Sequence, residues 1–226
     1  YRIAHSFDSS SSDAPKLHVT YDKSTIVVGS SCLAITLRKR VVNDKDDGQS
    51  TGSGEAVAAA GNTIQVNSDK FGLFRFTDLD IPDNATVKSA YIKVYSGADT
   101  SGATNFSISI ENAGNAGGIS GADGVSLKSF IGGVPWSVTS DWAEGNAYTS
   151  PDIKGLINAV LGAGWNAKNS MLLKMTRSSG EGRTIYAHDY QKQTKAAQLI
   201  INYVDDGTHG ADTVRDEMSQ VVDSLS

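Results

Sequence analysis

The chain has one cysteine, no surplus of basic residues and no long apolar run. A single cysteine among 226 residues excludes an internal disulfide framework and a cysteine-based zinc site. Lysine and arginine number 20 against 25 aspartate and glutamate, a net charge of −5, which argues against dedicated nucleic-acid binding. No apolar run reaches the roughly 18 residues of a membrane helix, so we expect no membrane insertion. The composition is that of a glycine-rich globular protein.

Short segments of alternating polar and apolar residues dominate what is present. A period of two with β-branched and aromatic residues is typical of half-buried strands. Glycine, asparagine, aspartate and serine clusters, such as 44–54 and 114–124, separate these segments. Many short strands with frequent turns predict an all-β protein, an antiparallel jelly-roll β-sandwich. The clearest predicted strands are 16–21, 90–95, 106–110 and 198–203.

One internal helix is predicted at about 150–161. Ser150 can cap it, and Pro151 suits the first helical position. The apolar residues then recur at helical spacing and give one apolar face; they are Ile153, Leu156, Ile157, Val160 and Leu161. We expect this helix to lie across an open end of the sandwich.

A second, C-terminal helix is predicted at 211–225, after the linker-like 205–207. Its apolar residues are Val214, Met218, Val221, Val222 and Leu225. A lone amphipathic helix of about 15 residues is marginal in water. We therefore expect it to form an interface with a partner, with the sandwich or with whatever follows.

The chain also contains an internal repeat. Residues 14–21 (APKLHVTY) align with residues 196–203 (AAQLIINY), and Arg2 and Ala4-His5 echo Arg183 and Ala187-His188. The repeat predicts that residues 1–22 are the closing strands of a similar, preceding domain. Two strands cannot bury a core alone, so either the rest of that domain is missing from this sequence or the strands complete another molecule's sheet. Leu17, Val19 and Tyr21 would then lie in an interface.

The repeat sets the predicted domain boundaries. Residues 23–35 are a linker or strand, 36–206 a complete β-sandwich domain, and 207–226 a linker and helix. The opening residues 1–5 lack the charged start and apolar stretch of a signal peptide. We expect the chain to be a portion of a longer protein.

An ordered series of short motifs resembles a known family. The series includes Phe71-Gly72-Leu73-Phe74-Arg75-Phe76, then Ile81-Pro82-Asp83-Asn84, Asp141-Trp142, Ser150-Pro151-Asp152-Ile153 and Gly164-Trp165-Asn166. It resembles the DNRLRE type and related carbohydrate-binding-module-like jelly-roll modules of large secreted bacterial proteins and phage surface and fibre proteins. The resemblance covers about residues 36–206. It implies a non-catalytic accessory or structural module, often in tandem, in an extracellular, cell-surface or virion-surface setting. The glycine-rich insertion 114–124 departs from the family, and a flexible or interface loop is its simplest interpretation.

Little in the sequence indicates catalysis. Gly48-Gln49-Ser50-Thr51-Gly52 matches G-x-S-x-G, but it lies in a polar loop and not at a strand-to-helix elbow. The four histidines are scattered, and none has the spacing of a zinc helix. His5 and His188 occupy equivalent positions of the repeat, which favours a structural hydrogen bond in a turn. Arg75, among apolar neighbours, needs an acidic partner or carbonyl oxygens. We expect no enzyme.

Two kinds of binding site remain open. Asp44, Asp46 and Asp47 form the densest cluster of acidic residues, a candidate structural calcium site; the alternative is a solvated acidic loop that keeps a sheet edge soluble. Trp142, Tyr148 and Tyr190 are candidates for stacking against a glycan. Large aromatic residues usually belong to a core, which favours a structural role for each tryptophan. Tyr148 and Tyr190, in polar loops, are better candidates for exposure.

The function expected from the sequence is a non-catalytic structural or assembly module of an extracellular filament, fibre or virion-surface protein. Its partners would be copies of itself or neighbouring domains of the same protein. The alternative is a carbohydrate-binding or adhesion module whose partners are surface glycans. Structural calcium is the candidate cofactor.

Overall fold

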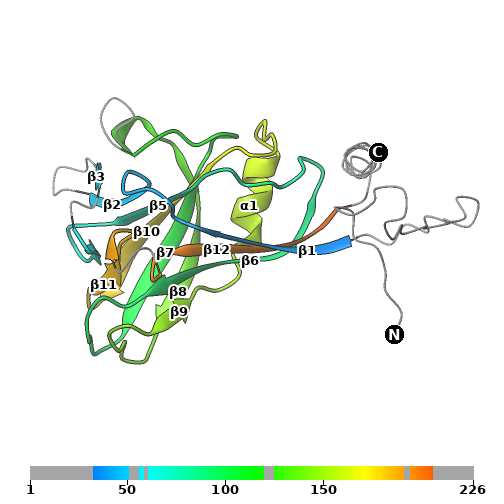
Figure 1. The fold of residues 1–226 in the computed structure, drawn as a ribbon. Helices are drawn as coiled ribbons and strands as arrows, with labels where there is room; N and C mark the ends of the chain where they lie inside the picture. The colour runs from blue at the N-terminus through cyan, green and yellow to red at the C-terminus, as the bar shows by residue number, and fades with distance from the viewer. Residues whose placement is uncertain (1–32, 51–55, 59–60, 120–124, 191–193, 206–226) are drawn as a thin grey trace, which may run out of the picture. The chain divides into compact units, whose positions relative to one another are not determined.

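The computed structural model describes residues 33–50, 56–58, 61–119, 125–190 and 194–205 (Figure 1). The strands of the first half are β1 (Leu33–Arg40), β2 (Asp47–Ser50), β3 (Ala56–Ala58), β4 (Thr63–Val66), β5 (Gly72–Phe76), β6 (Thr86–Tyr95) and β7 (Thr104–Glu111). A 3₁₀ turn, η3 (Val125–Leu127), precedes β8 (Phe130–Val138), β9 (Ala147–Thr149) and helix α1 (Lys154–Leu161). The chain then forms β10 (Met171–Gly180), β11 (Arg183–Tyr186) and β12 (Gln198–Asp205).

The two main sheets have the strand order of a jelly roll. The four-stranded sheet has the order β1-β12-β6-β9, and the six-stranded sheet has the order β3-β2-β5-β10-β7-β8. β4 and β11 form a separate two-stranded sheet. If β2, β3, β4 and β11 are set aside, eight strands remain. The first, eighth, third and sixth form one sheet, and the second, seventh, fourth and fifth form the other. All the described strand pairs are antiparallel, so the predicted antiparallel jelly-roll β-sandwich is confirmed.

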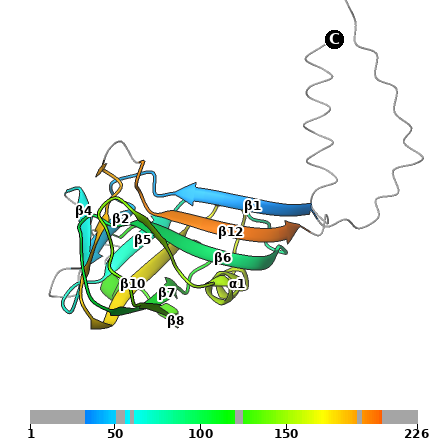
Figure 2. The ribbon, with the colours of Figure 1, turned by 90° about the horizontal axis from the view of Figure 1, so that it is seen from below.

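The predicted period of two places side chains as expected. In β12, which lies between β1 and β6 (Figure 2), the side chains of Leu199, Ile201 and Tyr203 are buried, and Gln198 and Asn202 are half-exposed. Because successive strand residues point to opposite faces, one face of β12 joins the core. The predicted strands 90–95 and 106–110 lie within β6 and β7 in the same way.

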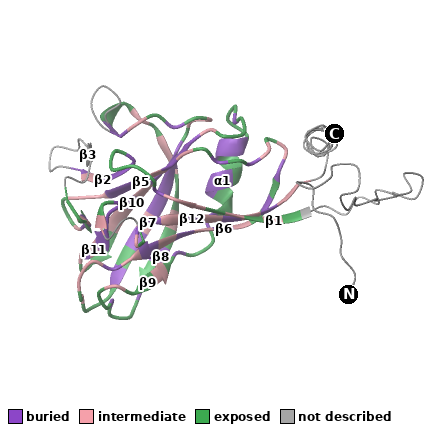
Figure 3. Cartoon of the chain, viewed as in Figure 1, coloured by how far each residue is buried: buried purple, intermediate pink, exposed green. Residues whose placement is uncertain are grey.

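The main hydrophobic core lies between the two sheets (Figure 3). Phe74 and Phe76 of β5 meet the buried side chains of β6, β7, β10 and β12 there. No helix of the described part is long and apolar enough to cross a membrane.

Helix α1 begins three residues later than the sequence predicts. Ile153, not Ser150, is the N-cap residue, and its own side chain makes no capping hydrogen bond. The Ser150 hydroxyl instead accepts the N–H of Ile92 at 3.0 Å, and Asp152 accepts the N–H of Ala90 at 2.9 Å. Both residues therefore tie the chain to β6, and Asp152 Oδ1 also accepts the N–H of Lys154, the first residue of the helix, at 2.9 Å. The C-terminal limit at Leu161 agrees with the prediction, and the buried face packs at one end of the sandwich as expected (Figure 1).

The outer face of the six-stranded sheet carries a second, smaller core. Ala116, Ile119 and Val125, from the glycine-rich segment after β7, bury Leu73 and Leu172. Arg75 Nε donates to the carbonyl oxygen of Ala116 at 2.9 Å. The described part of this insertion is therefore a packed cover over the sheet, held in place by apolar burial and by Arg75.

The first strand of the domain starts at Leu33, three residues before the predicted boundary at 36, and the last ends at Asp205. The predicted strands of residues 1–22 and the predicted C-terminal helix 211–225 lie outside the described residues. So do all the predicted interface residues, namely Leu17, Val19, Tyr21, Val214, Met218, Val221, Val222 and Leu225.

Candidate functional site

An aromatic cluster joins the edges of the two main sheets. It consists of Phe106 on β7, Trp136 on β8, Trp142 in the loop between β8 and β9, and Tyr148 on β9. Tyr148 stacks on Trp142, with ring centroids 4.2 Å apart and planes within 7°. Trp136 is tilted against both Trp142 and Phe106, at 5.7 Å and 5.8 Å. The cluster is thus one continuous set of ring contacts.

Strand pairing determines where these rings lie. Phe106 faces Trp136 across the β7–β8 ladder, and Val94 faces Tyr148 across the β6–β9 ladder. Two backbone hydrogen bonds of 2.8 Å join Trp142 to Thr100. β8 and β9 are the edge strands of different sheets, so the loop between them brings the two edges together around Trp142.

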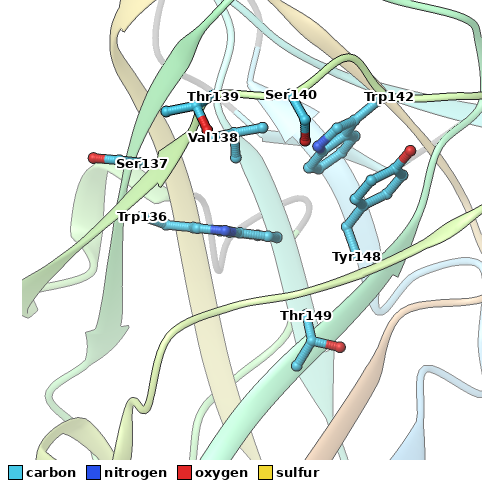
Figure 4. A pocket seen from close by; sticks show the side chains of 8 residues that line it. All are labelled: Trp136, Ser137, Val138, Thr139, Ser140, Trp142, Tyr148 and Thr149. Atoms are coloured by element: carbon cyan, nitrogen blue, oxygen red, sulfur yellow. The ribbon is translucent and has the colours of Figure 1, made fainter.

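A shallow hollow of about 180 Å³ lies over this cluster (Figure 4). Its lining combines two tryptophans, one tyrosine, one valine and four serine or threonine residues. None of the lining residues is charged; they are Trp136, Ser137, Val138, Thr139, Ser140, Trp142, Tyr148 and Thr149. Such a surface offers apolar area together with neutral hydrogen-bonding groups, as small-molecule sites usually do.

The lining residues differ in what they expose. Trp142 is 1% exposed and Trp136 is 6% exposed, so both tryptophans belong to the core, as the sequence favours. Tyr148 is half-buried, and Ser137, Thr139, Ser140 and Thr149 are exposed. The Tyr148 hydroxyl accepts the backbone N–H of Ala143 at 2.8 Å, which fixes the ring. The side chains that a ligand can reach are therefore Tyr148 and the hydroxyls.

A buried arginine faces the ring of Trp142. The guanidinium carbon of Arg183 lies 5.7 Å from the ring centroid, within the range of a cation–π interaction. Arg183 donates to the carbonyl oxygens of Gly102 and Gly182, at 2.5 Å and 3.0 Å. Burial lowers the pKa of Arg183, although the carboxylates of Asp141 and Glu181 oppose this shift. Trp142 thus has a stacked ring and a cation as neighbours.

Three buried polar atoms beside Trp142 have no hydrogen-bond partner among the described residues. They are Thr100 Oγ1, Trp142 Nε1 and Arg183 Nε. Buried polar atoms of this kind usually have a partner. The neighbourhood of Trp142 therefore departs from this rule at three atoms among the described residues.

Tyr190 belongs to a second aromatic pair. Its ring stacks on Tyr186, with centroids 3.6 Å apart and planes within 8°, and the Lys195 ammonium lies 5.4 Å from the Tyr186 centroid. Tyr186 donates to Glu144 Oε1 at 2.5 Å, and this hydrogen bond is the main reason that the pKa of Tyr186 is raised. Because Glu144 and Trp142 share one loop, that loop contacts both aromatic pairs.

The structure brings together two of the three predicted glycan-binding residues. Trp142 and Tyr148 stack on each other, whereas Tyr190 does not line the hollow. Sequence reasoning missed the hydroxyls of Ser137 and Thr139 beside Trp136. The alternation Trp136-Ser137-Val138-Thr139 was a usable signal, since it places the hydroxyls on the face opposite the buried residues.

The three predicted calcium ligands have different environments. Asp44 is exposed, whereas Asp46 Oδ1 accepts from Arg75 Nη1 at 2.7 Å, which confirms that Arg75 needed an acidic partner. Asp47 Oδ2 accepts the backbone N–H of His188 at 2.7 Å. Within the described ranges, no three His, Cys, Asp or Glu side chains gather in a way that could hold a metal ion. Calcium binding at Asp44, Asp46 and Asp47 stays a prediction.

Asp47 is the most perturbed carboxyl group of this loop. It is fully buried, and its Oδ1 has no hydrogen-bond partner in the described part of the chain. Burial raises the pKa of Asp47 to about 7, and the hydrogen bond from His188 offsets part of this rise. Asp47 therefore titrates near neutral pH.

The G-x-S-x-G serine has a structural contact. The Ser50 hydroxyl lies at the end of β2 and accepts the backbone N–H of Phe71 at 2.9 Å. Its side chain is buried, so this oxygen is engaged in joining β2 to the chain before β5.

Comparison with known proteins finds distant structural likeness only. No protein-family model matches the sequence, and no curated protein does. One similar solved structure is the isomalto-dextranase of Arthrobacter globiformis T6 complexed with panose, at 10% identity and a TM-score of 0.29. The likeness covers 76% of this chain but 33% of that one, so the chain spans about a third of the enzyme's length. Another is TmCBM61 in complex with β-1,4-galactotriose, at 8% identity and a TM-score of 0.20, covering 76% of this chain and 87% of that one. Likenesses at these levels assign neither a family nor a ligand to this chain.

Proposed function

We propose that the domain is a carbohydrate-binding module that holds a sugar in the hollow between β8 and β9. The observation that carries the proposal is the lining itself, in which the half-buried ring of Tyr148 lies among four exposed serine and threonine side chains. The C–H face of a pyranose is apolar and suits an aromatic ring, whereas its hydroxyls need neutral donors and acceptors. Both requirements are met by neighbouring side chains. In keeping with the sequence resemblance, the proposal places the module in an extracellular, cell-surface or virion-surface protein.

The lining favours binding over hydrolysis. Cleavage of a glycosidic bond commonly uses two carboxyl groups on opposite sides of that bond. The residues that line the hollow include no carboxylate, histidine, cysteine or lysine. The hollow therefore offers a surface for holding a sugar without a general acid or base.

The number of atoms in the sugar gives the expected binding affinity. A monosaccharide has about 12 non-hydrogen atoms, and at about −0.3 kcal/mol per atom the binding free energy is about −4 kcal/mol, or a Kd on the order of 1 mM. An oligosaccharide that extends over the exposed hydroxyls of Ser137 and Thr139 gains further contacts and binds more tightly.

The test is a glycan screen followed by titration, monitored by the amide NMR signals of residues 136–149. We expect Tyr148→Ala to weaken binding of the selected glycan at least about tenfold, because one stacked ring contributes about 1–3 kcal/mol in aromatic contacts of this kind. Tyr91→Ala is the matched control, since Tyr91 is a half-buried tyrosine of β6 outside the hollow. Equal weakening in both variants contradicts the proposal.

A second variant tests the hollow without changing a residue of the hydrophobic core. Ser140 is exposed and lines the hollow, so Ser140→Trp should fill it and abolish binding while the melting temperature stays unchanged. Ser68→Trp, at an exposed serine between β4 and β5, should leave binding intact. The proposal fails if no glycan shifts the signals of residues 136–149, or if Ser140→Trp still binds normally.

A further inference from the structure

A lysine on the outer face of the six-stranded sheet is held between two aromatic rings. The Lys174 ammonium lies 5.5 Å from the ring centroid of Phe71 and 4.2 Å from that of Phe130, and both distances are within the range of a cation–π interaction. Lys174 belongs to β10, Phe130 begins β8, and Phe71 precedes β5, so three separate segments build the arrangement. Lys174, Phe71 and Phe130 form what we call the lysine clamp.

Strand pairing places the lysine clamp on the outer face. Lys174 faces Leu73 across the β10–β5 ladder, and directly opposite residues of an antiparallel pair share one face. Leu73 belongs to the smaller core of the outer face, and Phe71 and Phe130 pack against that core. The half-buried side chain of Lys174 therefore runs beside apolar side chains, as long cationic side chains commonly do where they carry their charge to a surface.

The positive charge of Lys174 is unmatched among the described residues. No carboxylate of the described part forms an ion pair with it. The neighbouring carboxylate, Glu111, is engaged by Lys128, whose Nζ lies 3.1 Å and 3.3 Å from the two oxygens. Arg75, another cation of this face, pairs with Asp46. Lys128 and Arg75 are thus neutralised by the chain itself, whereas Lys174 is not.

The unmatched charge is accessible to a ligand. The Lys174 ammonium is not one of the fully buried, unpartnered atoms of the described part, so it reaches the surface. Burial of the rest of the side chain lowers the pKa of Lys174, because a charge in apolar surroundings is poorly solvated. An anion against the ammonium offsets this effect and accepts charge-assisted hydrogen bonds. A single ammonium matches the one charge of a carboxylate better than the charge of about −1.5 to −2 of a phosphate group.

A neutral polar strip leads from the lysine clamp to the hollow. Its residues are uncharged, exposed or half-exposed, and share the outer face; they are Asn105 and Ser107 on β7, Thr176 on β10, and Pro135 and Ser137 on β8. Ser137 also lines the hollow. Lys174 pairs with Ser109 of β7 and Ser137 with Asn105. At about 3.4 Å per residue and about 4.8 Å per strand spacing, the Cα atoms of Lys174 and Ser137 are about 17 Å apart, a span that suits a short oligosaccharide.

We infer that the domain binds an acidic oligosaccharide, in which a uronic acid carboxylate is held by Lys174 while a neutral unit of the same chain lies in the hollow. The inference rests on the proposed function, because the hollow supplies the binding of the neutral unit. The ammonium donates to the carboxylate, and the rings of Phe71 and Phe130 flank the contact. The polar strip between the two ends offers hydroxyl groups and no opposing charge.

A matched pair of ligands tests the role of the carboxylate. The probes are tetrasaccharides of glucose, galactose and xylose in which a single unit is a uronic acid, each titrated beside its neutral, carboxyl-reduced form. We expect one acidic probe to bind about tenfold more tightly than its reduced form. This preference should shrink as the salt concentration rises. The acidic probe should shift the amide NMR signals of Lys174 and of residues 136–149 together.

Three variants assign the preference to one side chain. Lys174→Gln should remove the tenfold preference and leave the affinity for the reduced form unchanged, without lowering the melting temperature, since no ion pair of the described part is lost. Lys174→Arg should keep the preference. Lys88→Gln is the matched control, because Lys88 is an exposed lysine of β6 in the other main sheet. It removes the same charge and should leave the preference intact.

The outcomes separate this inference from the proposed function. If neutral and acidic probes shift residues 136–149 with equal affinity, the inference is overturned and the proposed function stands. An acidic residue of the chain that already occupied Lys174 would give this same result. Equal loss of the preference in Lys174→Gln and Lys88→Gln also overturns the inference, since the overall charge then explains it. If no probe shifts residues 136–149, the proposed function fails, and the inference fails with it even where Lys174 responds.

Discussion

The backbone N–H of His188 donates to Oδ2 of Asp47 across 2.7 Å, joining the turn after β11 to the first residue of β2. These two residues are 141 positions apart in the sequence. The contact fixes the turn that carries Tyr190 to the six-stranded sheet. It also places a fully buried carboxyl group, Asp47, where only one of its oxygens has a partner among the described residues.

The first prediction concerns pH and Asp47. The pKa of Asp47 is about 7 in the folded chain, against an ordinary aspartate value of 3.8. Between these two pH values the folded state keeps a proton that the unfolded state has lost. The contribution of Asp47 to the free energy of unfolding is fully present below about pH 4. It is lost as pH rises through about 7, and its size is on the order of 4 kcal/mol. Melting temperatures measured from pH 4 to 8 should show this loss in the wild type and not in Asp47→Asn.

Asp44→Asn is the control for this prediction, because Asp44 is the exposed carboxylate of the same turn. It should retain the pH profile of the wild type. If Asp47→Asn and the wild type differ by a constant amount at every pH, the assigned titration of Asp47 is wrong.

The second prediction concerns the ion pair of Arg75 and Asp46. Their closest atoms are 2.7 Å apart, and their side chains are 20% and 10% exposed. Arg75→Met leaves Asp46 partly buried without its cation and frees the carbonyl of Ala116, so the free energy of unfolding should fall by about 3 kcal/mol. Urea unfolding measures the fall, and proteolysis within 112–129 should become faster. Lys154→Met, which breaks an exposed pair with Asp152 at 3.9 Å, should cost less than about 1 kcal/mol.

The third prediction concerns two glycines near α1. Gly132 has a φ of +80°, and a Cβ there would lie 2.1 Å from Leu156 Cδ2. Gly132→Ala should therefore lower the free energy of unfolding by about 2 to 4 kcal/mol, from backbone strain and overpacking. Gly155→Ala, within α1, meets nothing within 4 Å and should raise it by up to about 1 kcal/mol. Chemical denaturation should show changes of opposite sign in the free energy of unfolding of the two variants. If both variants are destabilised equally, the packing of α1 against β8 is contradicted.

The fourth prediction compares two buried tryptophans. Trp165 Nε1 donates to the carbonyl oxygen of Ile81 at 2.8 Å, whereas Trp142 Nε1 has no partner among the described residues. Both changes to phenylalanine remove similar volume, but Trp165→Phe also leaves a buried carbonyl without its donor. It should cost about 1–3 kcal/mol more than Trp142→Phe. Thermal unfolding of the pair measures the difference, and a loss for Trp142→Phe as large as that for Trp165→Phe would contradict the prediction.

The sequence by itself determined the sheets. Alternation with a period of two marked β6, β7 and β12, because one face of each strand is buried in the core and the other is not. The frequent turns between short strands indicated the sandwich, and the apolar surroundings of Arg75 indicated a charged partner. These features are local, so each can be recognised in a short window of residues.

Only the tertiary structure decided how the helix starts and where a ligand could bind. Ser150 and Asp152 are good helix-starting residues, yet both bind backbone N–H groups of β6, which lies some 60 residues earlier. The hollow needs Trp136 from β8, Tyr148 from β9 and the bridge between Thr100 and Trp142. β8 and β9 pair with different sheets, and no local pattern encodes which strand edges meet. Long-range strand pairing creates the site, whereas the alternation of residues within each strand creates the sheets.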